Sequence, residues 1–488
     1  MKTKLHIQGS FIEVRLFAFL FSLCILLPAV SSAQVISAGS YHSLAVCSDS
    51  TVRSWGWNNN GQLGVGTTTS SSTPVQVNSL TGIIAMDGGG VPPFMGNSSS
   101  HSVFLKNDGT VWACGKNNYG QLGDSTTTPS STPVQVNSLS GIIAVACGFF
   151  HSLFIKNDST VWACGRNFIG QLGDGTTTNR STPVQVSGLT GITSVASGGN
   201  HSLFLKNDGT VWACGQNLYG ALGVGDTIDR LTPVQVNSLT SIIAVAGGGS
   251  HSLFLKNDGT VWACGSNYLG QLGDSTTTDR STPVQVNSLT GIIAVASGGS
   301  HSLFLKNDGT VWACGLNTSG QLGDGTTTSS STPVQVNSLT GITAMAAGYL
   351  YSLFLKNDET VWACGRNVEG QLGNGTSDNN PHPTPVQVTG LCPMITSITE
   401  PKQEDGFQIY PNPTTGQFTI NLGSNNRKVV VTITDLRGKI IYATTAIDPD
   451  SYREQKIEVN IQDFATGIYV VQIQTADFMG TKKLVVEK

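Results

Sequence analysis

Histidine recurs in this sequence at a regular spacing that suggests metal binding or acid–base chemistry. Copies of the run HSLFLKNDGTVWACG, fifty residues apart over most of their length, begin at His42, His101, His151, His201, His251, His301 and Tyr351. Ligands of one metal ion lie about 2 Å from it, whereas equivalent positions in neighbouring packed sheets lie about 10 Å apart. The histidine column therefore predicts a structural role, in which the ring nitrogens tie neighbouring backbone together. The replacement of the seventh member by tyrosine agrees with that role.

Other patterns that carry chemistry are incomplete in this sequence. The Lys-Asn-Asp-Gly-Thr segments lack the spaced acidic ligands and the closing glutamate of a calcium loop. Glycine-rich stretches such as Gly223-Val224-Gly225 lack the Gly-Lys-Ser/Thr ending of a phosphate loop. The sequence also contains no nucleophile elbow and no zinc motif. We therefore predict no catalytic residue, no cofactor and no metal ion, with a polysaccharide-acting enzyme as the weaker alternative.

Each repeat contains four strand-length segments that must position these residues. In one copy they cover residues 242–246, 251–256, 260–264 and 283–286, and all are rich in β-branched, aromatic or other large apolar residues. The pair Asp258-Gly259 between two of them predicts a tight hairpin turn with positive φ at both positions. Seven such units predict an all-β fold, a seven-bladed β-propeller. Two phasings are compatible with the repeat: blades that coincide with it, and blades that straddle it so that the chain ends share one.

The repeat resembles a known family. The run GGSHSLFLKNDGT from Gly248 and the run GSNYLGQLG from Gly265 are similar to the regulator of chromosome condensation repeat. The resemblance covers about residues 34–391 and implies a seven-bladed propeller. One departure is the column that contains Cys264, where the family more often has tryptophan and this chain has it only at Trp55.

The cysteines are predicted to be mostly unpaired. Six of them share one column, and about 10 Å between equivalent positions exceeds the roughly 4.4–6.8 Å that a disulfide needs between Cα atoms. They are interpreted as small buried hydrophobic residues. Cys47, Cys147 and Cys392 lie outside the column, and a bond between Cys47 and Cys392 that clamps the ends of the array is left open beside free thiols.

The N-terminus and the composition predict an exported protein. Lys2, Lys4 and Arg15 precede an apolar run at 16–27, and small residues end at Ala33, which predicts a signal peptide over residues 1–33. No second long apolar run follows, so the mature chain is expected to lack a transmembrane segment. Charged residues make up 11% of the chain and the formal net charge is −4, so no basic surface for nucleic acid is expected.

The C-terminal region differs in composition from the repeats. A linker at 392–406 leads to strand-like runs over 407–488 that predict a small β-sandwich. Four motifs there resemble the type A C-terminal sorting domain of the type IX secretion system of Bacteroidota. The motif residues are Pro411, Asn412, Pro413, Gly416, Asp435, Gly438, Lys439, Gly467, Tyr469 and Lys483. The resemblance implies interaction with the type IX machinery and delivery, through the periplasm, to the cell surface or the medium.

The seven copies disagree mainly before the histidine column and in the segment after the third strand. In a four-stranded blade both connections lie on the same face, and varied loops on a rigid frame are typical of a binding scaffold. The candidate partner-binding residues are Pro93, Phe94, Met95, Tyr119, Phe149, Phe150, Phe168, Tyr219, Tyr268 and Tyr349. We predict a non-enzymatic propeller that binds a protein or glycan. Two alternatives stay open: these residues pack between blades, or the chain is a structural or adhesive surface protein with glycosylated Ser/Thr-rich loops such as 67–73 and 125–132.

Overall fold

Every regular element in the part of the chain that the structure describes is a β-strand. The computed structural model describes residues 35–91 and 99–394, followed by 408–410, 412, 414–415, 417–422, 428–434, 440–447, 455–462, 467–474 and 479–486. The chain divides into two compact units, Met1–Thr396 and Ser397–Lys488. Neither unit, within those residues, contains a helix long and apolar enough to cross a membrane.

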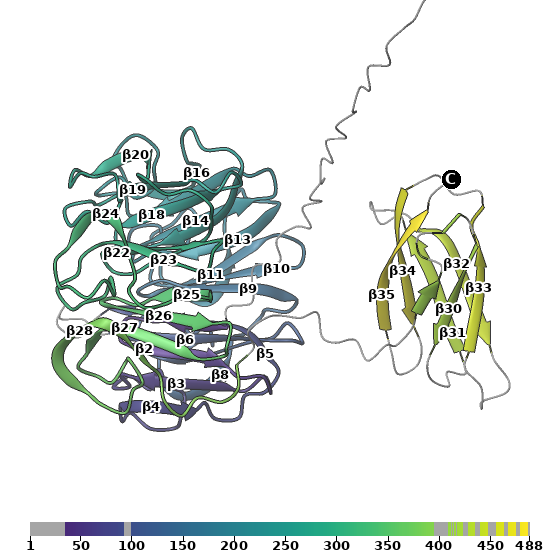
Figure 1. The fold of residues 1–488 in the computed structure, drawn as a ribbon, viewed down its shortest axis with the longest axis horizontal. Coiled ribbons are helices and arrows are strands. Elements are labelled where there is room, and N and C mark those ends of the chain that lie inside the picture. Colours follow the sequence, from purple (N-terminus) through teal and green to yellow (C-terminus); the bar gives the residue numbers. More distant parts are fainter. Residues whose placement is uncertain are drawn as a thin grey trace, which may run out of the picture. The chain divides into compact units, whose positions relative to one another are not determined.

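The first unit contains seven four-stranded antiparallel sheets, which are the blades of a propeller (Figure 1). Blades 1 to 3 are formed by β1 (Ile36–Ala38), β2 (His42–Val46), β3 (Val52–Gly56) and β4 (Ser71–Gln76); β5 (Ile83–Val91), β6 (Ser99–Lys106), β7 (Val111–Gly115) and β8 (Ser130–Gln135); and β9 (Ile142–Cys147), β10 (His151–Lys156), β11 (Val161–Gly165) and β12 (Arg180–Gln185). Blades 4 and 5 are formed by β13 (Ile192–Ser197), β14 (His201–Lys206), β15 (Val211–Gly215) and β16 (Arg230–Gln235); and β17 (Ile242–Gly247), β18 (His251–Lys256), β19 (Val261–Gly265) and β20 (Arg280–Gln285). Blades 6 and 7 are formed by β21 (Ile292–Ser297), β22 (His301–Lys306), β23 (Val311–Gly315) and β24 (Ser330–Gln335); and β25 (Ile342–Ala347), β26 (Tyr351–Lys356), β27 (Val361–Asn367) and β28 (Asp378–Gln387). The predicted all-β propeller is confirmed, and each blade is one continuous stretch of chain, so the chain ends do not share a blade.

The hairpin turn between the second and third strands differs in detail from its prediction. The Asp258 carboxylate accepts hydrogen bonds from the Thr260 amide (2.9 Å) and hydroxyl (2.6 Å). Only the second position of the Asp-Gly pair has positive φ, at 77° for Gly259. Ser159 and Glu359 adopt a similar φ at the same position. The aspartate therefore holds the turn through its side chain, and glycine is preferred there but not required.

The core consists of apolar layers between neighbouring blades. Between blades 4 and 5, for example, Val211, Ala213 and Leu222 pack against Phe254 and Cys264 of the next blade. The column cysteines are free and fully buried, as predicted, and burial raises the pKa of their thiols well above the ordinary value. They act as small apolar residues that fill the layer between two blades.

A histidine and a serine join each blade to the next. His251 Nε2 lies 3.0 Å from Ser302 Oγ of blade 6, and Ser302 Oγ donates to the Gln271 carbonyl of blade 5 at 2.7 Å. The serine hydroxyl donates its one hydrogen to that carbonyl, so in the contact with Ser302 the histidine Nε2 must be the donor and Ser302 Oγ the acceptor. The structural role of the histidine column is thus confirmed, although the ring binds a serine side chain and not backbone. The same His–Ser pair recurs at His42, His101, His151, His201 and His301.

The ring closes between blades 7 and 1. Tyr351 replaces histidine there, and its hydroxyl donates to the His42 carbonyl and lies 3.0 Å from Ser43 Oγ. In Figure 1 the purple strands of blade 1 lie beside the green strands of blade 7, and β1 contacts β25 and β26. A disulfide joins Cys47 to Cys392, with a Cα–Cα distance of 5.7 Å. The clamp between the ends, left open by the sequence, is therefore formed.

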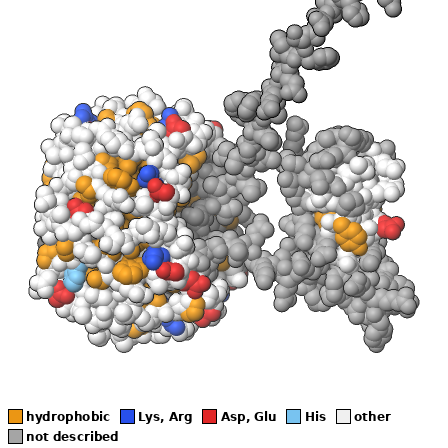
Figure 2. Space-filling view, viewed as in Figure 1, with side chains coloured by type: hydrophobic (Ala, Val, Ile, Leu, Met, Phe, Trp, Pro, Cys, Tyr) orange, Lys and Arg blue, Asp and Glu red, His pale blue; other side chains and the backbone are white. Residues whose placement is uncertain are grey.

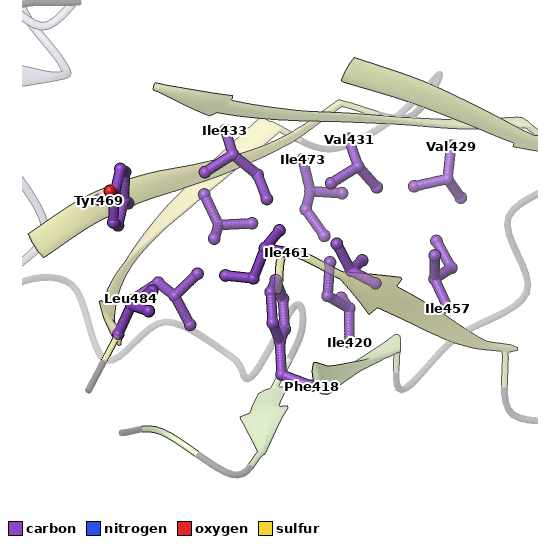
Figure 3. Packing of buried hydrophobic residues seen from close by; sticks show 13 residues of the cluster. Phe418, Ile420, Val429, Val431, Ile433, Ile457, Ile461, Tyr469, Ile473 and Leu484 are labelled. Carbon is purple, nitrogen blue, oxygen red and sulfur yellow. The ribbon is translucent and has the colours of Figure 1, made fainter. Parts of the chain in front are cut away.

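The second unit contains two small sheets. One has the order β29 (Gln408–Tyr410), β30 (Gln417–Leu422), β33 (Gln455–Asn460), and the other has the order β32 (Ile440–Ile447), β31 (Lys428–Thr434), β34 (Gly467–Gln474), β35 (Met479–Val486). Buried side chains such as Phe418 and Ile420 from the first sheet point toward Val431 and Ile473 from the second (Figure 3). The predicted small β-sandwich is confirmed.

Candidate binding face

In the blades whose connections the structure describes, both variable connections lie on one face of the propeller, as predicted. In blade 3 the Arg166 amide, which follows β11, donates to the Phe150 carbonyl, which precedes β10. The equivalent bond recurs in blade 4 from Gln216 to Asn200. The hairpin turn and the link between blades meet on the opposite face, where the Asn157 amide donates to the Gly141 carbonyl. We call the first the loop face and the second the turn face.

The centre of the loop face is a collar of backbone hydrogen bonds around the propeller axis. The Phe149 amide donates to Gly199 O, Gly199 donates to Gly248 O, and Tyr349 donates to Ser40 O of blade 1. A Cβ atom on Gly199 would lie 2.5 Å from the Gly249 carbonyl and 2.6 Å from the Phe149 ring. Glycine is therefore needed where neighbouring connections approach this closely.

Aromatic side chains from blades far apart in sequence meet at this collar. The Phe149 and Tyr349 ring centroids are 6.3 Å apart, although they belong to blades 3 and 7. Both rings are half-buried. Burial raises the pKa of Tyr349, and an electrostatic interaction with Tyr268 from blade 5 raises it further. The axial end of the loop face is thus aromatic.

A guanidinium group lies among three more aromatic rings. The Arg166 Cζ is 5.7 Å from the ring of Tyr119, 5.2 Å from Phe150 and 5.1 Å from Phe168. Tyr119 also contacts Phe150 and Phe168 edge to face at 5.4 and 5.8 Å. These are distances at which cation–π attraction and aromatic contacts fix side chains. We call Tyr119, Phe149, Phe150, Arg166, Phe168, Tyr268 and Tyr349 the aromatic cluster.

Exposure divides the predicted residues into two roles. Phe168 is 54% exposed and Tyr268 is 63% exposed, whereas Phe150 is only 5% exposed and supports Tyr119 and Arg166 from below. Tyr219, 41% exposed, comes from blade 4. Pro93, Phe94 and Met95 lie outside the described residues. The rings that a partner could reach are therefore Phe168, Tyr219 and Tyr268.

Sequence reasoning did not place Arg166 among the candidate binding residues and missed a second group at the closure of the ring. Tyr41, Trp57 and Leu350 form a buried cluster on the loop face, and the Arg366 guanidinium lies 5.6 Å from the Tyr41 ring. Arg166 and Arg366 occupy the same position of the repeat, directly before Asn167 and Asn367. The available signal for both arginines was their position, directly after a strand and next to loops that contain aromatic residues.

Charges on the propeller are few and mostly paired. Figure 2 shows them on one face as isolated blue and red groups among uncharged and hydrophobic side chains. On the loop side, Arg180 pairs with Asp174 at 2.7 Å and Arg280 with Asp274 at 2.8 Å. Burial opposes ionisation of Asp174, but hydrogen bonds from Arg180 and Thr176 outweigh it and lower its pKa. No group of three or more His, Cys, Asp or Glu side chains among the described residues is arranged to hold a metal ion.

The structure describes four of the predicted sorting-motif residues, Asn412, Gly467, Tyr469 and Lys483. Gly467 pairs with Val486, Lys483 pairs with Val470, and Tyr469 is buried in the core of the sandwich. Pro411, Pro413, Gly416, Asp435, Gly438 and Lys439 lie outside the described residues.

Comparison with protein families matches both units. The RCC1-like domain matches residues 195–399, and the regulator of chromosome condensation (RCC1) repeat matches residues 49–90, 108–155 and 158–205. The chain belongs to the RCC1 repeat family. Its RCC1-like propeller is followed by a secretion system C-terminal sorting domain, matched over residues 408–487. The predicted combination of repeat and sorting domain is confirmed.

Curated relatives resemble only part of the RCC1-like propeller. A segment of 120 residues is 38% identical to the human probable E3 ubiquitin-protein ligase HERC6, and covers 23% of this chain and 11% of that protein. A segment of 117 residues is 36% identical to the ultraviolet-B receptor UVR8 of Arabidopsis thaliana, and covers 23% of this chain and 25% of that receptor. The matches thus span no more than a quarter of these relatives.

Solved structures share the fold of the RCC1-like propeller at low sequence identity. Human WBSCR16 has a TM-score of 0.61 and 23% identity, with 69% of this chain and 93% of that chain covered. Prp20p of Saccharomyces cerevisiae, described with its binding properties to Gsp1p and histones, has a TM-score of 0.61 and 22% identity, with 73% and 87% covered. At these identities the likeness establishes the fold.

Proposed function

We propose that this chain is an exported, non-enzymatic RCC1-like propeller that binds a protein or glycan partner through its loop face. The sorting domain would direct it through the type IX machinery to the cell surface or the medium. The binding role is supported by one observation above all: aromatic side chains from blades 2, 3 and 7 meet on the loop face, and Phe168 and Tyr268 on that face are more than half exposed.

The arrangement of the aromatic cluster favours recognition over chemistry. Phe149, Phe150 and Tyr349 pack within the face and hold the cluster in place, while Phe168 and Tyr268 present flat apolar surface to the solvent. Rigid aromatic side chains lose little conformational entropy on binding and are enriched among residues that dominate binding energy. Prp20p, which shares the fold, binds Gsp1p and histones; for this exported chain we propose a different, extracellular partner.

The chain itself supplies conservative substitutions for the test. The loop position of Phe168 and Tyr268 is Thr318 in blade 6, so Phe168→Thr and Tyr268→Thr introduce a residue that the repeat already accepts. Ile143 and Ile293 on the turn face are 49% and 55% exposed, and their position is Thr193 in blade 4. The pair Ile143→Thr and Ile293→Thr therefore removes exposed apolar surface from the opposite face as a matched control.

The experiment is a quantitative pull-down from cell envelopes and culture medium of the producing organism, with the parent chain and both double variants. Loss of two exposed aromatic contacts is expected to weaken capture of a specific partner by about tenfold or more. The turn-face variant is expected to capture as the parent does. Equal capture by the parent and the loop-face variant would contradict the proposal.

A further inference from the structure

Exposed large hydrophobic residues on the loop face are concentrated around blade 4. Leu218 is 57% exposed, Tyr219 41%, Ile228 65% and Leu231 40%. We call these four residues the blade-4 patch. It is flanked by Phe168 of blade 3 and Tyr268 of blade 5, which occupy the same loop position on either side. Among the described residues, the loop-face connections of the other four blades expose no large hydrophobic side chain to this degree.

Two members of the patch are departures from the chain's own repeat. In blades 1, 2, 3, 5 and 6 the position of Ile228 is occupied by Thr69, Thr128, Thr178, Thr278 and Thr328. The position of Leu231 is occupied in the same blades by Ser72, Ser131, Ser181, Ser281 and Ser331. The fold therefore does not need an apolar residue at either place.

The patch is carried by fixed backbone. The Asn217 amide donates to the Asp229 carboxylate at 2.7 Å, and its side chain donates to the Asp226 carbonyl at 2.9 Å. These bonds hold the loop that carries Ile228 against the segment that carries Leu218. Leu231 lies at the start of β16, packed against Gly170 of blade 3. A surface held in this way loses little freedom when it is covered.

The apolar area of the patch can be compared with the area that a stable protein–protein interface buries. A large aromatic side chain offers about 150–250 Å², so the four patch residues with Phe168 and Tyr268, each about half exposed, present on the order of 600 Å² of apolar surface. The largest patch on a typical monomer is about 300–600 Å². A standard interface buries about 800 Å² on each partner, which the patch and its polar border can supply.

We propose that the blade-4 patch binds a second copy of this chain around a two-fold axis. Such an axis places blade 4 on blade 4, with Phe168 of one copy toward Tyr268 of the other, and an interface of this kind must be self-complementary. The border of the patch meets that requirement because it carries both signs of charge. Arg230 pairs with Asp226 at 2.5 Å, and Asp229 lies directly beside it, so each copy offers a cation and carboxylates to the other.

The overall charge of the chain also permits self-association. The formal net charge is only −4 over 488 residues, so two copies repel each other weakly. Because the dimer covers Phe168 and Tyr268, dimerisation and capture of the proposed partner would exclude each other at these two side chains. The dimer itself does not depend on the partner proposed above.

The test is sedimentation velocity of the full chain over a range of concentrations, without any added partner. The parent is expected to form a dimer, and Ile228→Thr with Leu231→Ser is expected to weaken dimerisation by at least tenfold. Because both substitutions restore residues of the neighbouring blades, the variant is expected to show an unchanged far-ultraviolet circular dichroism spectrum. The variant with Ile143→Thr and Ile293→Thr serves as the matched control and is expected to dimerise as the parent does.

A parent chain that stays monomeric up to about 100 μM would overturn the proposal, because its dissociation constant would then be far weaker than that of standard interfaces. The patch would in that case be assigned to another kind of partner. A dimer that persists unchanged in the blade-4 variant would overturn it as well. Neither result bears on partner capture by Phe168 and Tyr268, so the two proposals fail separately.

Discussion

Each boundary between two blades depends on a few buried hydrogen-bonding atoms. At the closure of the ring, Ser43 Oγ lies 3.0 Å from the Tyr351 hydroxyl and 2.9 Å from the Gln371 carbonyl. The Tyr351 hydroxyl itself donates to the His42 carbonyl. Burial raises the pKa of Tyr351, so the phenol stays protonated and able to donate. One hydroxyl thus connects the last blade to the first.

Tyr351→Phe tests that connection. The variant leaves the buried His42 carbonyl without this donor, which is expected to cost about 1–3 kcal/mol in the free energy of unfolding. Urea unfolding monitored by tryptophan fluorescence measures the change. Tyr219→Phe, which removes a hydroxyl from an exposed side chain, is expected to stay within about 0.5 kcal/mol of the parent. Equal stability of the two variants would contradict the role given to Tyr351.

The blades as elements depend on histidines that must stay neutral. Burial, together with smaller contributions from neighbouring His201 and His301, lowers the pKa of His251 from about 6.5 to about 3. The pKa of His201 is lowered to about 4, again by burial. Because the folded-state pKa lies below the unfolded value, the unfolded chain binds more protons. The stabilisation is therefore complete above about pH 6.5 and is lost as the pH falls toward 4.

The propeller is accordingly expected to unfold in mild acid. Below the unfolded pKa, each such histidine lowers the free energy of unfolding by about 1.4 kcal/mol per pH unit. The six histidines together are therefore expected to lower it by on the order of 10 kcal/mol between pH 7 and pH 5. Denaturant titrations at several pH values measure this slope. His201→Gln removes one linked proton and is expected to reduce the loss by about 2 kcal/mol. A free energy of unfolding that stays constant from pH 7 to pH 5 would refute the assignment.

The elements were largely predictable because each is specified locally. The apolar run within 251–256 and the Asp258-Gly259 pair identify two strands and their turn in this copy, and the other copies keep the aspartate. The serine that receives each histidine was not predictable, because His251 and Ser302 meet only through the register between two blades. The aromatic surroundings of Arg166 were missed for the same reason: its three aromatic neighbours come from two blades. The face that holds the candidate residues followed from strand order, whereas their separation into buried and exposed rings depended on packing.

The phasing of the blades is a property of the whole molecule that a periodic sequence does not reveal. Identical repeats yield the same set of strands wherever a blade is taken to begin, so only the two ends of the array decide the phasing. Here β1 to β4 form a complete blade, so no strand is shared and the ring is closed by side chains and by the disulfide. The carbonyl of Pro393 also accepts from the Ser48 amide, beside the disulfide. The closure therefore lies where the chain leaves the propeller.

Removal of the disulfide tests the closure of the whole ring. The bond joins residues separated by 345 positions, so Cys47→Ser with Cys392→Ser is expected to cost about 3–5 kcal/mol in the free energy of unfolding. Hydrogen exchange is expected to rise first in β1 and β28, the terminal strands of the ring. Reductant is expected to destabilise the parent but not the variant, because the other described cysteines are free thiols. Exchange that rises equally in all blades would contradict a local closure.

The central claim, that the loop face is the binding surface, is tested most directly by photo-crosslinking on living cells that secrete the chain. A photoreactive phenylalanine analogue replaces Phe168 or Tyr268 on the loop face, and Ile143 or Ile293 on the turn face, in separate variants. The account predicts a discrete covalent adduct, the same from positions 168 and 268 and absent from positions 143 and 293. Adducts that form equally from both faces, or only from the turn face, would contradict it.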